Sequence, residues 1–102
     1  MPFVSTETGV SSTLTLHSGR FYQIVVLEPT GAVTIDAVSA IPNAGVLWIV
    51  AGNDRVTLRR SATLVLLQPT ANPDLAMQTD DRLMFLCRSG TRVIELDRGL
   101  TL

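Results

Sequence analysis

VLWIVAGNDRVTLR, residues 46–59, joins an apolar segment to an alternating one through a polar turn. Residues 46–51 are apolar throughout, the next three are Gly-Asn-Asp, and residues 55–59 alternate polar and apolar side chains. Apolar or alternating runs bounded by glycine, asparagine and aspartate are typical of β-strands and hairpins. We therefore expect two strands joined by a tight hairpin, with Val56 and Leu58 facing inward.

Similar runs recur at short intervals on both sides of this stretch. They predict about eight short strands, at residues 13–17, 21–27, 32–36, 46–51, 55–59, 63–67, 82–87 and 91–97. Only residues 74–78 favour a helical turn, and Ser89-Gly90 favours a hairpin turn. The expected fold class is all-β, a small antiparallel β-sandwich or barrel-like domain. Residues 1–12, rich in Ser, Thr and Gly, are expected to form an extended N-terminal arm before a single β domain at 13–102.

One weak internal similarity stands out. Residues 25–30, VVLEPT, resemble residues 65–70, VLLQPT. Duplication of a strand-and-turn unit would explain the match, and so would chance, because short β segments look alike.

Four of the expected strands are apolar without alternation. A strand wetted on one face alternates, whereas a strand covered on both faces need not. A chain of 102 residues with 46% hydrophobic residues has little material to cover both faces itself. We therefore expect a second copy of the chain to cover part of this apolar surface. The expected interface residues are Val25, Leu47, Trp48, Val50, Leu66, Met84 and Leu86.

Charge and cysteine content narrow the class of partner. The net charge is −1, which gives no basic footprint for nucleic acid or for an anionic membrane. The single cysteine, Cys87, lies in an apolar run and is expected to be a buried hydrophobe rather than a reactive thiol. No apolar run is long enough to span a bilayer, and the N-terminus does not resemble a secretory signal.

Few residues in the chain suggest catalysis or metal binding. His17 is the only histidine, so any Ser-His-Asp or Cys-His site would depend on it. Asp80-Asp81 is the only acidic pair, and its expected role is in a turn rather than in a calcium site. No phosphate-binding glycine loop is present, and we expect no cofactor and no catalytic or metal site.

Residues 32–98 resemble a β-module of bacteriophage virion proteins, of the capsid decoration and tail fibre type. The resemblance rests on the segments VTI (33–35), IPNAG (41–45), VLWIV (46–50), VTL (56–58), DDRLMFL (80–86), RSG (88–90) and VIEL (93–96). It implies a homotrimer and a non-enzymatic virion structural protein. Because the module is almost the whole chain, a capsid decoration (cement) protein is the preferred hypothesis. Such a protein would be made in the bacterial host cytoplasm and bind the major capsid protein on the outside of the head.

In this hypothesis the arm would lie across capsid subunits, with Phe3 and Val4 as apolar anchors. The alternative is a phage tail or receptor- or glycan-binding module. Its recognition residues would be Tyr22, Asn53, Asp54, Asn72 and Asp74. A third hypothesis is a small enzyme with an intersubunit site around His17.

Overall fold

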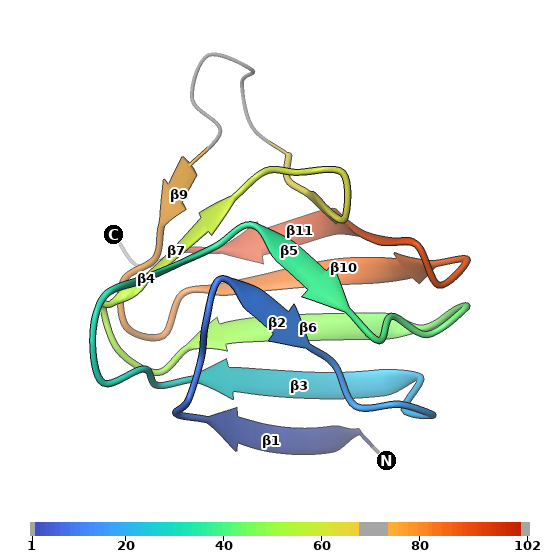
Figure 1. Cartoon of the computed structure of the whole chain (residues 1–102), viewed down its shortest axis with the longest axis horizontal. Coiled ribbons are helices and arrows are strands. Elements are labelled where there is room, and N and C mark those ends of the chain that lie inside the picture. The colour runs from blue at the N-terminus through green and yellow to red at the C-terminus, as the bar shows by residue number, and fades with distance from the viewer. Residues whose placement is uncertain (1, 68–73, 101–102) are drawn as a thin grey trace.

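The computed structural model describes residues 2–67 and 74–100, which form eleven β-strands and no helix (Figure 1). The all-β prediction is confirmed. The strands are β1 (Phe3–Glu7), β2 (Thr13–Thr15), β3 (Tyr22–Leu27), β4 (Val33–Ile35), β5 (Ala37–Ser39), β6 (Val46–Ala51), β7 (Val56–Arg59), β8 (Leu64–Val65), β9 (Asp74–Ala76), β10 (Arg82–Arg88) and β11 (Arg92–Gly99).

The segment expected to form a helical turn, residues 74–78, contains strand β9 instead. β9 pairs antiparallel with β7, with Ala76 opposite Thr57. Beyond the strand, the Met77 N–H donates to the Val56 carbonyl at 2.9 Å, and the Met77 side chain is buried. One isolated helical turn gains too little from its own hydrogen bonds to compete with this pairing.

Three sheets enclose one apolar core. The strand orders are β1-β3-β6-β10-β11-β8, β2-β5 and β4-β7-β9. From β3 to β6 the chain visits the six-stranded, three-stranded, two-stranded and again the six-stranded sheet, which makes one turn of a coil. Successive turns stack in parallel, so Val46 pairs with Tyr22 and Ala37 pairs with Thr13, in each case 24 positions apart (46 − 22 and 37 − 13).

The expected antiparallel arrangement is therefore only partly correct. Five of the eight strand pairings in the described residues are parallel: β1–β3, β3–β6, β2–β5, β4–β7 and β8–β11. Parallel neighbours need a long crossover connection rather than a two-residue turn. Here residues 28–45 supply that crossover between β3 and β6, and they contain β4 and β5.

The two hairpin predictions have opposite outcomes. Residues 52–54 turn a corner between two sheets, since β6 and β7 do not pair and the Gly52 N–H donates to the Leu27 carbonyl at 2.8 Å. The hairpin at Ser89-Gly90 is confirmed. Both residues have positive φ, 55° and 67°, and Thr91 N–H donates to the Arg88 carbonyl at 3.0 Å. Positive φ at both positions matches the right-handed twist of β10 and β11.

The N-terminal segment differs from the expected extended arm that precedes the β domain, because part of it is a strand of that domain. Strand β1 lies in the six-stranded sheet beside β3, in register from Phe3 opposite Gln23 to Glu7 opposite Leu27. The Glu28 N–H extends this ladder by donating to the Glu7 carbonyl at 2.8 Å. Polar composition alone does not show that residues 3–7 complete a sheet edge, because their partner lies on the next turn of the coil.

The core is built from side chains that point inward from all three sheets. One face of the six-stranded sheet supplies most of it, and alternate residues of β3, β6 and β10 are buried. The buried apolar residues are Leu14, Leu16, Val25, Leu27, Ile35, Val38, Leu47, Ile49, Ala51, Val56, Leu58, Leu64, Leu66, Met77, Leu83, Phe85, Cys87 and Val93.

Candidate interaction surface

The face of the six-stranded sheet that points away from the core is apolar. Side chains of directly paired residues share a face, and register places Ile24, Trp48 and Met84 in one row across the sheet. We call this surface the outer face. Its half-buried apolar members are Ile24, Val26, Val46, Trp48, Val50, Met84, Leu86 and Ile94.

The borders of the outer face are more exposed and partly basic. Val4 at the β1 edge is 58% exposed, and Tyr22 at the start of β3 is 47% exposed. Across the sheet, Arg88 at the end of β10 and Arg92 at the start of β11 are exposed and directly paired. An apolar centre with a polar, charged rim is the usual anatomy of a protein interface.

A shallow hollow of about 320 Å³ lies on this face. It is lined by Tyr22, Ile24, Trp48, Val50 and Arg82. The hollow is mainly apolar, and its lining includes Tyr22 and Arg82, whose side chains carry polar groups.

The expected interface residues divide between the two faces of the sheet. Trp48, Val50, Met84 and Leu86 lie on the outer face. The other three were assigned wrongly, because they are buried in the chain's own core: Val25 is 1% exposed, Leu47 0% and Leu66 4%. Neighbouring residues of a strand point to opposite faces, and an uninterrupted apolar run does not show which residues face inward.

The expected arm anchors have different environments. Val4 is exposed on the outer face, whereas Phe3 already has partners within the chain. The Phe3 ring meets the His17 ring edge-on with centroids 4.7 Å apart, and the Arg20 guanidinium carbon lies 4.4 Å from the Phe3 centroid. Phe3 therefore holds the turn before β3 against β1 and is not a free anchor.

Besides this ring contact with Phe3, the His17 side chain makes two polar contacts to β1, both through the same ring nitrogen. Its Nε2 lies 3.2 Å from the Ser5 Oγ and 3.4 Å from a Glu7 carboxylate oxygen. A catalytic triad uses both ring nitrogens, one for the nucleophile and the other for the acid. The arrangement at His17 lacks that geometry and ties β1 to the segment that precedes β3.

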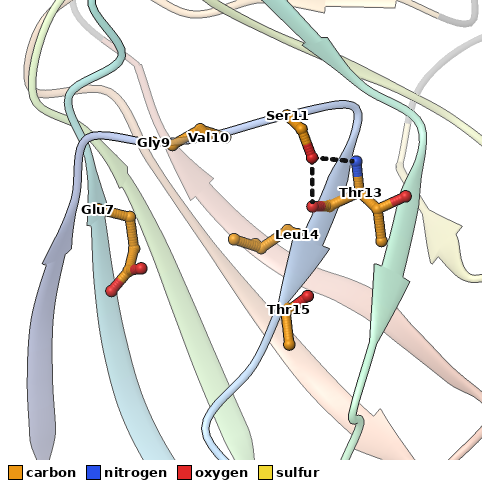
Figure 2. A pocket seen from close by; sticks show the side chains of 7 residues that line it. All are labelled: Glu7, Gly9, Val10, Ser11, Thr13, Leu14 and Thr15. Carbon is orange, nitrogen blue, oxygen red and sulfur yellow. Dashed lines mark hydrogen bonds between the residues drawn. The ribbon is translucent and has the colours of Figure 1, made fainter.

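A second hollow, of about 160 Å³, lies between β1 and β2 at the N-terminal end of the coil (Figure 2). Its lining is largely polar and consists of Glu7, Gly9, Val10, Ser11, Thr13, Leu14 and Thr15. The Ser11 hydroxyl donates to the Thr13 carbonyl at 3.2 Å and lies 3.4 Å from the Thr13 N–H, which fixes the entry into β2 (Figure 2).

Two of the residues considered for recognition already form hydrogen bonds within the chain, Asn53 in a turn and Asp74 between strands β9 and β7. Asn53 donates to the Pro29 carbonyl at 2.9 Å and accepts from the Arg55 N–H at 3.0 Å. Asp74 accepts two hydrogen bonds from Arg59, at 2.8 and 3.1 Å, and this partner holds the pKa of Asp74 below its usual value.

The structure shows less about the remaining recognition candidates. Asp54 is exposed, and Asn72 lies outside the described residues. Of the four candidates among the described residues, Tyr22 alone contributes to the outer face.

The cysteine and the acidic pair are both partly or wholly buried. Cys87 is 3% exposed, and burial raises the pKa of its thiol. Asp81 is buried, and its carboxylate accepts a hydrogen bond from the Gln78 N–H at 2.8 Å, as expected for a turn. Within residues 2–67 and 74–100, no three His, Cys, Asp or Glu side chains are grouped to hold a metal ion.

The residues missed by sequence reasoning are the other members of the outer face, namely Ile24, Val26, Val46 and Ile94, and Arg82 in the hollow. Each is two positions from another member of the face on the same strand, or is paired with one on the next strand.

In the described part of the chain no helix is long and apolar enough to cross a membrane. Comparison with known proteins finds no matching family model, curated protein or solved structure.

Proposed function

We propose that this chain is a non-enzymatic structural protein that assembles through the outer face of its six-stranded sheet. The observation that carries the proposal is the apolar outer face, with Trp48 at its centre and arginines at its rim. A contiguous exposed apolar patch on a small domain marks an interaction site. Tryptophan and arginine are also the residues most enriched at interface hot spots.

The proposed assembly is a homotrimer on the outside of a bacteriophage head, where it acts as a capsid decoration protein. The resemblance of residues 32–98 to phage virion modules supports this assignment. In a trimer each copy would cover part of its neighbour's outer face, and many weak contacts with the major capsid protein would act together.

The position of β1 changes the expected mode of capsid contact. Residues 3–7 belong to the sheet, so they are not available as a detachable tail. Contact with the capsid would use the exposed Val4 together with the segment between β1 and β2.

Sedimentation velocity tests the assembly part of this proposal. The wild-type chain should sediment as a trimer or a multiple of it, and Trp48→Gln/Leu86→Gln should abolish the three-fold contact. Phe21→Gln is the matched control, because Phe21 is 60% exposed and precedes β3. A wild-type chain without a three-fold species at any concentration would overturn the proposed trimer.

Cosedimentation with phage heads stripped of their outer proteins tests the location. Saturable binding in multiples of three copies per lattice site is expected. Absence of binding would reject the decoration role and leave the assembly result standing.

A receptor- or glycan-binding role is the second candidate, favoured by the hollow at Tyr22, Trp48 and Arg82. Apolar pockets with a few placed polar groups are typical ligand sites. A glycan array with wild type and Tyr22→Ala would support this role if binding occurred and the substitution removed it. An array without binding would reject it for glycans.

A further inference from the structure

Strand β1 is an edge strand whose usual protection is confined to its two ends, where Pro2 precedes it and Glu7 is its last residue. It pairs with β3 alone among the described strands and lies at the border of the sheet (Figure 1). Protein sheets commonly protect such edges with charges, prolines or bulges. The register of β1 is regular along its length, and its first four residues, Phe-Val-Ser-Thr, carry no charge. This edge can therefore accept another strand.

The direction of one hydrogen bond shows which main-chain groups are available. The Glu7 carbonyl accepts from the Glu28 N–H, so the main-chain groups of Glu7 face β3. In a parallel pair, alternate residues bond to the same neighbour. The N–H and C=O groups of Ser5 therefore also face β3, and those of Val4 and Thr6 point away from the sheet.

We propose that a second copy of this chain pairs with β1 antiparallel, about a two-fold axis at Ser5. In this register Val4 lies opposite the partner's Thr6, and Thr6 lies opposite the partner's Val4. These are the two residues with outward main-chain groups, so both pairs exchange their hydrogen bonds as an antiparallel ladder requires. The contact is self-complementary and closed, as expected for a two-fold interface.

The side chains also fit this register. Phe3 lies opposite the partner's Glu7, and Arg20 sits over the Phe3 ring at 4.4 Å. The partner's Glu7 carboxylate is thereby brought towards Arg20, and the symmetric contact repeats on the other side of the axis. This opposite-charge pairing favours the two-fold register over a parallel one, which would place Glu7 beside the partner's Glu7.

The inference is independent of the proposed trimer, because it uses the edge of the sheet rather than its outer face. If both contacts form, two-fold edge pairing would link trimers through their N-terminal ends. The test must therefore use a variant whose outer face no longer self-associates.

In the Trp48→Gln/Leu86→Gln background, sedimentation equilibrium should show a dimer. Adding Thr6→Pro should convert it to a monomer, because proline removes an outward N–H that β3 does not use. Thr6→Val, which keeps that N–H, is the matched control and should remain dimeric. A monomer in the starting background would overturn the inference, as would a dimer unaffected by Thr6→Pro.

Cysteine cross-linking tests the register directly. Opposed residues in a non-hydrogen-bonded antiparallel pair have Cα atoms about 4.5 Å apart, within disulfide range. Ser5→Cys on the axis should give a covalent dimer on mild oxidation, whereas Val4→Cys should not, because its symmetry mate lies further away. A dimer from Val4→Cys alone, or from neither variant, would overturn the proposed register.

Discussion

At the residue scale, Glu95 is a buried carboxylate whose hydrogen-bond partners compensate for its burial. Its side chain is 0% exposed. It accepts from Arg98 through both oxygens at 2.6 Å and from the Leu67 N–H at 2.8 Å. A buried charge is tolerated only when it is paired and hydrogen-bonded in this way.

Arg98→Ala is expected to destabilise the chain by about 2–3 kcal/mol, since it leaves Glu95 unpaired. The value lies below the range for fully buried pairs, because the Arg98 side chain is 24% exposed. Urea unfolding measures the change. Arg59→Ala, which breaks the solvent-exposed Arg59–Asp74 pair, is the control and should have little effect. Equal losses in the two variants would contradict this account.

Ionisation of the Cys87 thiol is expected to lower the stability of the fold at alkaline pH. Burial raises the pKa of the folded thiol above its ordinary 9.0. The stability that it contributes is therefore complete below the unfolded pKa and is lost as pH rises through the folded pKa. Between pH 7.5 and 10, the free energy of unfolding should fall more for the wild type than for Cys87→Ala. The same fall in both proteins would show that this thiol is not responsible.

At the element scale, β6 has two faces with different energetic roles. Ile49 is fully buried, and the adjacent Val50 lies on the outer face. Ile49→Ala should cost about 2–5 kcal/mol of unfolding free energy, because it leaves a core cavity. Val50→Ala should cost less than about 1.5 kcal/mol when measured below the concentration of self-association. Urea titrations of both variants test this assignment, and a larger loss at Val50 would reverse it.

Strand positions agree well with local sequence where strands are long. Residues 46–51 were predicted as a strand and form β6 with the same bounds, and residues 82–87 fall within β10. The missed strands are β1, β5 and β9, and their ladders depend on partners from distant parts of the chain. Their polar or mixed composition gives no periodic signal strong enough to mark them.

At the scale of the whole molecule, the N-terminal segment is part of the folded structure. Deleting residues 1–12 should remove β1, expose the edge of β3 and lower the free energy of unfolding by more than about 2 kcal/mol, because several ladder hydrogen bonds are lost. Val4→Ser keeps the ladder and is the control. Circular dichroism during urea unfolding measures both. A truncated chain as stable as the wild type would restore the interpretation of residues 1–12 as a free arm.

The stacking of coil turns is also a property of the whole molecule, and it can be compared with the internal similarity in the sequence. Within the described part of the similarity between residues 25–30 and 65–70 the matched positions do not stack, since Val65 in β8 pairs with Ile94 rather than with Val25. The stacked partners are instead Tyr22 with Val46 and Thr13 with Ala37. Those side chains differ in type, but further along the stacked ladders Val26 pairs with Val50, Val33 with Val56 and Thr34 with Thr57, so the stacking leaves a short trace in the sequence.

The sequence by itself determined the all-β class, the long strands and the Ser89-Gly90 hairpin, because these follow from local periodicity and from backbone preferences within a few residues. It also determined that the chain has more apolar surface than one small core can hold. Only the tertiary structure decided which side of each apolar strand faces inward, and thereby separated Leu47 in the core from Trp48 on the outer face. Parallel stacking and the place of β1 were likewise decided there, because they depend on contacts between segments about one coil turn apart, which no local pattern encodes.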